Sequence, residues 1–338
     1  MFSVPARNGD LLIEEVGNRL RKLTAVPSSP SVFISRQSCT TTYPLDLIEK
    51  FLDVVGLAAV CEVIGRDSDP KTVADNISRL SAAYCDPVEF VNKRILDFGC
   101  GYGASSVALA KLFPESQVVG VDLREDRIRL ASACAEHHGL GNVKFSVAPS
   151  GSELPSDAGQ FDFVYLFAVY EHLLPTERPV IMKLLWSVLK PGGTLFIDAT
   201  PHRYFPVDLH STNLPLINYL PDRLAHYAAR KFARVGPQIN KSPLWEDHLR
   251  GGLRGATEKQ ILRNIGQDDA FVPMLLTPSK HGLNDRCDYW YSQLSPRYSV
   301  LKKAIRRGLK SVYRVSGTVL TPNISLAIKK QRGPSDSR

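Results

Sequence analysis

With 338 residues, of which 43% are hydrophobic and 22% charged, the chain can form one large domain or two ordinary ones and can bury a sizeable core. Its longest apolar run, 54–61, falls far short of the roughly 20 residues of a membrane span, and acids at Asp10, Glu14 and Glu15 argue against a secretory signal, so we expect a soluble protein. The net charge of +8 belongs to the C-terminal part, since the stretch from Leu301 onward holds ten Lys or Arg against one acid, and an anionic partner is expected there.

The part of the chain before residue 91 is predicted to be a helical N-terminal cap, covering 1–90. Leu45, Ile48 and Leu52 recur at the spacing of one helix face. The segment 72–84 has the pattern of a second helix.

From Arg94 onward, short buried runs alternate with helical patterns. Strands are expected at 95–98, 117–121, 143–147, 161–167 and 194–198. Helices are expected between them, at 104–113, 126–138 and 179–189. Strands that alternate with helices in this way form right-handed βαβ units and a parallel sheet. The predicted fold class is therefore α/β, a Rossmann-like seven-stranded mostly parallel sheet with a helical N-terminal cap and insertions.

Two insertions interrupt this alternation after Ala199. They cover about 201–252 and 280–320 and are rich in aromatic residues, and we expect them to fold as lids over the same domain. Residues 91–338 are thus predicted to be one domain that carries both insertions.

Regular elements return between and after the insertions. Thr257 is the expected N-cap of a helix over 258–265, and 270–276 is an apolar stretch that fits a sixth strand. The polar and apolar residues of 323–328 alternate, which indicates a final edge strand.

Six cysteines are scattered along the chain without the paired spacing of a zinc site or the clustering of a disulfide framework. Reduced thiols in the cytosol are the better interpretation. A cytoplasmic location is therefore expected, and peripheral contact with a membrane is one interpretation of the basic segment 300–315.

A glycine-rich turn follows the first expected strand, with the sequence Asp97-Phe98-Gly99-Cys100-Gly101-Tyr102-Gly103. Glycines let the backbone approach a ligand closely, and the helix N-terminus that follows offers unpaired N–H groups. Asp122 ends the next expected strand, where a carboxylate can accept both ribose hydroxyls of an adenosine-containing cofactor. Open α/β sheets bind such cofactors at the carboxyl ends of their strands.

This pattern has two interpretations. Gly99, Gly101 and Ala104 also satisfy the dinucleotide fingerprint G-x-G-x-x-G/A, which indicates NAD. Against NAD, Asp97 stands two residues before the first glycine, where a fixed carboxylate suits the ammonium group of a methionine moiety better than a pyrophosphate. The turn also lies behind a long helical preface, whereas NAD domains often begin at the start of a chain.

Four segments in the expected order resemble the class I S-adenosylmethionine-dependent methyltransferases, and more closely the small-molecule O-methyltransferases of the ubiquinone-biosynthesis type. The segments are 95–103, 119–122, 161–165 with 171–173, and 189–195. The resemblance covers about residues 90 to 200, and it implies methyl transfer with S-adenosyl-L-methionine as the cofactor.

The resemblance also implies which residues hold the cofactor. From the methionine end through the ribose to the adenine, and with Phe167 near the sulfonium, they are Asp97, Gly99, Cys100, Gly101, Gly103, Asp122, Leu123, Ser150, Gly151 and Phe167. Ser150 stands where the family usually places an acid that binds the adenine amine.

A hydroxyl acceptor gains from a general base with a pKa near neutrality, which favours histidine. His172 follows the fourth expected strand, while His202 and His210 fall in the first insertion; of the three, His172 and His210 are the predicted catalytic residues. Glu171 and His172 match two ligands of a metal site in some quinone-pathway relatives. Ala168 stands where a further acid is expected, so no metal is predicted.

The sequence thus predicts an S-adenosylmethionine-dependent methyltransferase that acts on a hydroxyl of a small molecule, a glycan or a lipid-linked intermediate. Three alternatives stay open: a nucleic-acid methyltransferase, an NAD-dependent oxidoreductase and a catalytically silent cofactor-binding protein. Nucleic acid is the less favoured partner, because the fourth strand lacks the Asn/Asp-Pro-Pro-Tyr/Phe sequence of enzymes that methylate exocyclic amines.

The segment 300–315 is predicted to be a basic amphipathic helix. Lys and Arg residues surround one apolar stripe, which consists of Leu301, Ile305, Leu309 and Val312. One interpretation is a lid helix whose stripe packs on the domain while its charges face water. A second is peripheral contact with anionic lipid or a lipid-linked substrate. A third is contact with nucleic acid, which is less favoured because the charge lies outside the catalytic core and no RNA-binding module is apparent.

Overall fold

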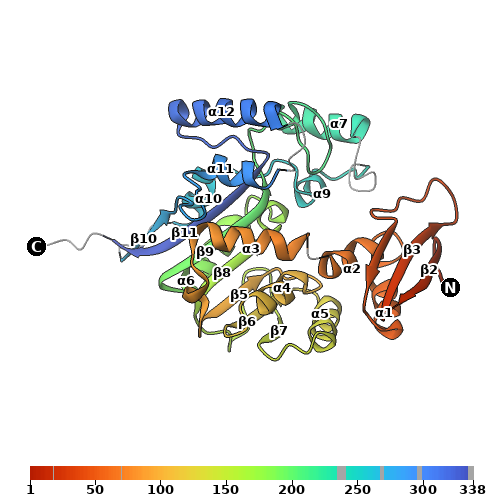
Figure 1. The fold of residues 1–338 in the computed structure, drawn as a ribbon. Helices are drawn as coiled ribbons and strands as arrows, with labels where there is room; N and C mark the ends of the chain where they lie inside the picture. Colours follow the sequence, from red (N-terminus) through yellow and green to blue (C-terminus); the bar gives the residue numbers. More distant parts are fainter. Residues whose placement is uncertain (18, 70, 234–240, 267–269, 295–298, 334–338) are drawn as a thin grey trace, which may run out of the picture. The chain divides into compact units, whose positions relative to one another are not determined.

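The computed structural model describes residues 1–17, 19–69, 71–233, 241–266, 270–294 and 299–333. Its helices and strands follow the chain in this order (Figure 1): β1 (Phe2–Ala6), β2 (Gly9–Gly17), β3 (Leu20–Pro27), β4 (Ser38–Thr41), α1 (Leu45–Val55), α2 (Val60–Ser68), α3 (Val73–Tyr84), β5 (Arg94–Phe98), α4 (Ala104–Leu112), β6 (Gln117–Asp122), α5 (Glu125–His137), β7 (Val143–Val147), β8 (Phe161–Phe167), α6 (Arg178–Val188), β9 (Leu189–Pro201), α7 (Asp222–Phe232), α9 (Trp245–Arg250), α10 (Glu258–Ile265), β10 (Phe271–Leu275), α11 (Arg286–Ser292), α12 (Ser299–Ser316) and β11 (Asn323–Arg332). Two compact units make up the chain. The first consists of Met1–Arg79, Phe90–Asn92 and Gly99–Pro149, and the second of Leu80–Glu89, Lys93–Phe98 and Ser150–Arg338.

The first unit begins with a four-stranded antiparallel sheet in the order β1-β2-β3-β4. The prediction of a helical cap over 1–90 is therefore wrong for the residues of these strands and confirmed for those of α1, α2 and α3. On β2, Leu11 and Ile13 are fully buried, as are Leu23 and Ala25 on β3. Buried residues spaced by two are the signature of a strand with one buried face, and this period is what the helical prediction overlooked.

Seven strands form one sheet in the order β10-β11-β9-β8-β5-β6-β7. β8 is parallel to both β5 and β9, and β6 is parallel to β7, whereas β11 is antiparallel to β9 and β10. The predicted Rossmann-like, mostly parallel seven-stranded sheet is confirmed. The chain order reverses between β5 and β8, and ligands of open α/β sheets bind outside the carboxyl ends of the strands at such a switch point.

β11 is not the edge strand that the alternation of 323–328 predicts. It pairs with β9 on one side and with β10 on the other, so β10 is the edge strand. Lys330 of β11 is buried, and its Nζ donates hydrogen bonds to the carbonyl oxygens of Trp186 (2.6 Å) and Leu189 (2.8 Å). Because a buried polar group with such partners is tolerated inside a sheet, polar alternation alone does not mark an edge.

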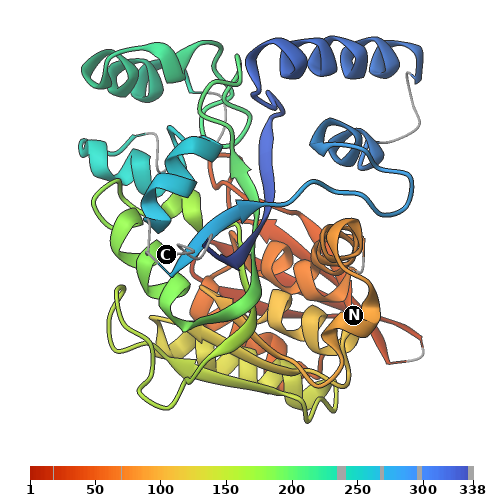
Figure 2. The ribbon, with the colours of Figure 1, turned by 90° about the vertical axis from the view of Figure 1, so that its left-hand side faces the viewer.

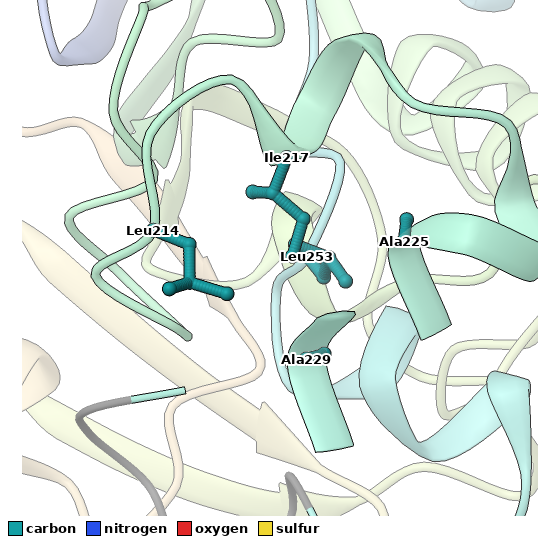
Figure 3. Close-up of a cluster of buried hydrophobic side chains, with 5 residues drawn as sticks. All are labelled: Leu214, Ile217, Ala225, Ala229 and Leu253. Carbon is teal, nitrogen blue, oxygen red and sulfur yellow. The ribbon is translucent and has the colours of Figure 1, made fainter. Parts of the chain in front are cut away.

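The first insertion builds a small core of its own within the second unit. α7 packs Ala225 and Ala229 against Leu214, Ile217 and Leu253 (Figure 3). The second insertion carries α11 and α12, and both views place α12 at the same end of this unit as α7 (Figure 2). Parts of the two insertions, 234–240 and 295–298, lie outside the described residues, and their action as lids stays a prediction.

The capping prediction for α10 is confirmed. Thr257 Oγ1 accepts a hydrogen bond from the N–H of Gln260 at 3.2 Å, and the Gln260 side chain accepts one from the N–H of Thr257 at 3.3 Å. This reciprocal capping box satisfies two N–H groups that a helix start otherwise leaves unpaired.

Two predictions about the whole chain can be compared with the structure. All six cysteines are buried, and none of them forms a disulfide within the described part of the chain. Among the helices of the described residues, none has the length and apolar character that a transmembrane segment requires.

Candidate active site

In the first unit, the glycine-rich turn folds back on β6. The N–H groups of Gly99 and Cys100 both donate to the carbonyl oxygen of Val121, at 2.8 and 3.0 Å. Gly101 has a φ of +56°, and a Cβ placed there would meet no atom of the described residues within 4 Å. The backbone of the turn is therefore fixed by its hydrogen bonds to β6, and space for a ligand remains beside Gly101.

Gly103 is packed as tightly as Gly101 is open. It is the N-cap of α4 with a φ of +89°, and a Cβ there would lie 2.7 Å from the Cβ of Ala131. Only glycine fits both the angle and the space, so α4 begins directly at the turn. The unpaired N–H groups of a helix start favour a negatively charged group such as the carboxylate of a methionine moiety.

Asp122, at the end of β6, holds this turn from the other side. Its Oδ2 accepts a hydrogen bond from the N–H of Gly101 (3.1 Å), and its Oδ1 accepts one from the N–H of Arg124 (3.0 Å). A carboxylate has about four lone-pair positions, so each oxygen keeps one for a ribose hydroxyl. Leu123, the next residue, is 56% exposed, and an apolar side chain in that position suits the face of an adenine ring. These residues fit the adenosine half of S-adenosylmethionine.

In the second unit, two neighbouring strands end with residues that the sequence assigns to the cofactor. Asp97 of β5 is buried and in register with Tyr165 of β8. β8 ends at Phe167, which is in register with Asp198 of β9, and the next residue, Ala168, has a φ of +54°. Such a backbone angle is uncommon for alanine, and strain of this kind gathers at binding sites. Asp97 and Phe167, both predicted to hold the cofactor, thus lie toward the carboxyl ends of adjacent strands.

Three side chains of the second unit come together after β8, and we call them the acid–histidine cluster: Glu171, His172 and His210. One potential ligand atom of each lies within 4.8 Å of the others. The ring centroids of His172 and His210 are 5.8 Å apart, and Nε2 of His172 is 3.7 Å from Oε1 of Glu171. The structure therefore brings the two predicted catalytic histidines together and adds an acid to them.

Glu171 is fully buried. Its Oε2 accepts a hydrogen bond from the hydroxyl of Thr200 at 3.2 Å, while its Oε1 has no hydrogen-bond partner among the described residues. Burial raises the pKa of Glu171 to about 7, because a carboxylate without water loses its solvation. Burial likewise raises the pKa of Asp198 to about 6, although the hydroxyl of Ser325 donates to it. Two buried acids on adjacent segments thus titrate near neutrality.

The protein backbone orients both histidines. Nδ1 of His172 is 2.6 Å from the carbonyl oxygen of Arg250, so Nδ1 donates a hydrogen bond to that oxygen and Nε2 lies on the side of Glu171. Gly252 leaves room for His210, since a Cβ at Gly252 would lie 2.5 Å from Cδ2 of that ring. The pKa of His210 is lowered, mainly by desolvation and secondly by His172. His210 is therefore held in the neutral form that can accept a proton.

The acid–histidine cluster could also hold a metal ion, since each of its members offers one ligand atom. The prediction that no metal binds rests on Ala168, which replaces an acid of the related metal site. The comparison with the related metal site did not include His210, because His210 belongs to the first insertion. The absence of a metal stays a prediction.

The remaining predicted residues have varied surroundings. His202 is buried, its Nδ1 accepts a hydrogen bond from the N–H of Tyr204 (3.1 Å), and burial lowers its pKa to about 4. Such a histidine is held by the backbone as a structural residue. Ser150 Oγ accepts a hydrogen bond from the N–H of Ser152 at 3.3 Å, and Gly151 is exposed between them. Contact of Ser150 and Gly151 with adenine stays a prediction.

Two residues near the acid–histidine cluster, Asp198 and Gly252, were not predicted as site residues from the sequence. Asp198 could have been found, because it directly follows an apolar strand run, as Asp97 and Asp122 do. Gly252 could not, since its importance depends on where the ring of His210 packs.

Glu171 should make the stability of the protein depend on pH. Its pKa is raised from 4.5 to about 7, so between these values the folded chain binds more protons than the unfolded chain, and the free energy of unfolding falls as the pH rises. A rise of this size corresponds to about 3 kcal/mol. Glu171→Gln, which is neutral at every pH, lacks this fall. In urea unfolding, we expect the variant to gain stability over wild type between about pH 5 and about pH 8.

Glu177→Gln is the control of opposite sign. Arg250 holds the pKa of Glu177 below its ordinary value through a bidentate contact at 2.6 and 2.9 Å. Glu177 therefore contributes stability above its unfolded pKa, and its variant should lose stability relative to wild type as the pH rises. If the free energy of unfolding of Glu171→Gln instead changed with pH as that of wild type does, the pKa of Glu171 would not be raised by folding.

Comparisons with known proteins show similarity to methyltransferases in the central part of the chain. The family model described as "Methyltransferase domain" matches residues 95–193. The chain is 30% identical over 115 residues to the ubiquinone biosynthesis O-methyltransferase of Acinetobacter baylyi, covering 33% of this chain and 47% of that protein. It is 33% identical over 145 residues to the fatty-acid O-methyltransferase of Mycolicibacterium smegmatis, covering 40% and 50%.

A further relative is the uncharacterized protein RP028 of Rickettsia prowazekii, at 30% identity over 113 residues, with 33% of this chain and 45% of that protein covered. The chain thus spans about half the length of the curated relatives it matches. The matched region includes the glycine-rich turn, Asp122, Glu171 and His172. It decides between the two interpretations of the turn in favour of a methyl donor over NAD, and residues 95–193 are a class I S-adenosylmethionine-dependent methyltransferase domain.

Proposed function

We propose that the chain transfers a methyl group from S-adenosylmethionine to a hydroxyl oxygen of a small molecule, a glycan or a lipid-linked intermediate. The observation that carries this proposal is the acid–histidine cluster, in which two histidines and a buried acid meet just after β8. A hydroxyl is a weak nucleophile until a base takes its proton, and a neutral histidine is suited to that task near pH 7.

Each member of the cluster has a part in this proposal. S-adenosylmethionine, when bound, supplies a methyl group on a positively charged sulfur, which leaves as a neutral thioether when the acceptor oxygen bonds to the methyl carbon. His210 accepts the hydroxyl proton on its ring nitrogen. The acid Glu171, when ionised, stabilises the positive charge that develops on His210, and His172, oriented by the carbonyl of Arg250, lies beside that ring. Gly252 keeps the ring in place.

Oxygen is favoured as the acceptor atom by two further points. The fourth strand lacks the sequence typical of enzymes that methylate exocyclic amines, since Phe167 is followed by Ala168, Val169 and Tyr170. Two of the relatives are named as O-methyltransferases, one of ubiquinone biosynthesis and one of fatty acids. The acceptors of those relatives share an oxygen nucleophile, and this supports the same atom type here.

A labelled-methyl experiment tests the proposal. Lipid and metabolite extracts of cells that lack the gene are incubated with the purified chain and S-adenosylmethionine that carries a deuterated methyl group. We expect mass spectrometry to find a product heavier by one deuterated methyl, whose fragments place the label on an ether or ester oxygen. Asp122→Ala should form none of it, because that variant loses the ribose contacts.

Other outcomes have a defined meaning. A label on nitrogen or carbon would overturn O-methylation while leaving the methyltransferase domain in place. Tight binding of S-adenosylhomocysteine without any labelled product, in extracts of every polarity, would make the chain a silent cofactor-binding protein.

A further inference from the structure

The apolar face of α12 points to solvent. None of the residues Ser299–Ser316, all of which are described, is buried. Leu301, Ile305, Val312 and Val315 recur at helical spacing on one face and are 61%, 43%, 42% and 91% exposed. The interpretation that this stripe packs on the domain is therefore wrong for the residues just named. A contiguous exposed apolar stripe of this kind is typical of a surface that binds a partner.

The opposite, cationic face attaches α12 to the second unit. Arg306 Nη2 lies 2.6 Å from Oδ1 of Asp288, and Lys310 Nζ lies 2.7 Å from the same oxygen and 3.1 Å from Oδ2 of Asp285. The Arg306 guanidinium also stacks over the ring of Tyr291 at 5.0 Å. Since Asp288 is buried, these charges anchor the helix from its inner side. The ion pairs thus determine that the apolar face is turned outward.

Further cations of α12 lie on sides of the helix away from the apolar face. Lys303, Arg307 and Arg314 are exposed, and each follows an apolar residue of the stripe by two positions, which turns it about 160° away from that residue. A helix with one exposed apolar face and a Lys- and Arg-rich polar face lies in the plane of a lipid surface, with the apolar side chains in the acyl boundary and the long cationic side chains reaching anionic headgroups.

α7 stands at the same end of the second unit as α12 (Figures 1 and 2). Its inner side is the small alanine face that packs in the insertion core. Its outer side exposes Leu224, Tyr227 and Phe232, each by more than half, together with Arg223 and Arg230. Two amphipathic helices of the same charge sign thus stand at this end of the second unit, and we call their exposed apolar sides together the α7–α12 face.

We propose that the α7–α12 face docks on an anionic lipid bilayer. Nucleic acid would use the cations but would leave the apolar stripe in water. A second copy of this chain would cover the apolar stripe but would leave the exposed cations of α12 without negative partners. A bilayer surface accommodates both features at once, because it offers acyl chains and negative headgroups in the same plane. This proposal stands independently of the acceptor atom and of catalysis.

Co-sedimentation of the full chain with vesicles tests the proposal. We expect binding to phosphatidylcholine vesicles that contain phosphatidylglycerol, little binding to phosphatidylcholine alone, and weaker binding in added salt. Arg307→Gln with Arg314→Gln should weaken binding about 25-fold, at about fivefold for each cation near an anionic surface. Leu301→Ser with Ile305→Ser should weaken it at least about tenfold through lost apolar burial.

Matched variants complete the design. Lys259→Gln with Arg263→Gln removes two exposed cations of α10 in the same unit, and Val180→Ser removes an exposed apolar side chain of α6. Both should bind vesicles as wild type does. Equal binding to neutral and anionic vesicles would overturn the proposal. So would an RNA affinity that the serine variants leave unchanged, or self-association that they abolish. The readout needs no methyl transfer, so its failure and that of the proposed function are distinguishable.

Discussion

Asp122→Ala is expected to weaken the binding of S-adenosylhomocysteine about a hundredfold, measured by isothermal titration calorimetry. The two oxygens of Asp122 each have one bond to a backbone N–H and a lone pair to spare. Two hydrogen bonds from ribose hydroxyls to a charged acceptor are worth about 1.5 kcal/mol each, and the sum of about 3 kcal/mol corresponds to about two decades in Kd. The open turn at Gly101 loses an acceptor as well, which adds to the effect.

Two companion variants separate binding from folding. Asp122→Asn keeps one oxygen acceptor at the same place and should bind with intermediate affinity. Asp126→Asn removes the nearby carboxylate that pairs with Arg124 on the surface, and it should bind as wild type does. If Asp122→Ala bound S-adenosylhomocysteine as tightly as wild type and kept its circular dichroism spectrum, the adenosine half would have to bind elsewhere.

His210→Gln is expected to lower kcat for the methylated acceptor by ~10²–10⁴-fold, the usual contribution of a general base. Glutamine is close to histidine in size, so it fills the space beside Gly252 but cannot take a proton at neutral pH. The Kd of S-adenosylhomocysteine should not change, because the residues that are predicted to hold the adenosine half are untouched. The lowered pKa of His210 also predicts that kcat of wild type is already level at neutral pH.

The control for this prediction is His281→Gln, at an exposed turn of the second unit, which should keep full activity. Treatment of wild type with EDTA should leave kcat unchanged, because no metal is predicted. A loss of activity that added Zn²⁺ or Mg²⁺ restores would assign the acid–histidine cluster to a metal ion instead. An unchanged kcat in His210→Gln would leave alignment of the reacting atoms, rather than proton removal, as the source of the rate.

The elements that the sequence predicts well are those whose signals are local. The strands and helices from Arg94 to Asp198 follow from buried runs, helix breaks and glycine turns, and Thr257 starts its helix through contacts within four residues. β1 to β4 were missed although Leu11 and Ile13 show a strand period, because short runs of this kind are ambiguous until their partners are known. The inner position of β11 depends on pairing across both insertions, which no local pattern contains.

The candidate site divides in the same way. The glycine-rich turn and Asp122 can be found because the chain itself joins them to consecutive strands. That Glu171 lies beside both histidines depends on the path of the first insertion, which brings His210 to it. The outward apolar face of α12 depends on the ion pairs of Arg306 and Lys310, and helical periodicity gives a stripe but not the side on which the protein lies.

The inner position of β11 has a consequence for synthesis on the ribosome. β9 and β10 leave the exit tunnel first, and both must wait for β11 before their facing edges are paired. During that interval the growing chain presents two open strand edges, which are templates for pairing with other chains. Chaperones that bind the growing chain during this interval would thus meet β9 and β10 before the strand that joins them has been made.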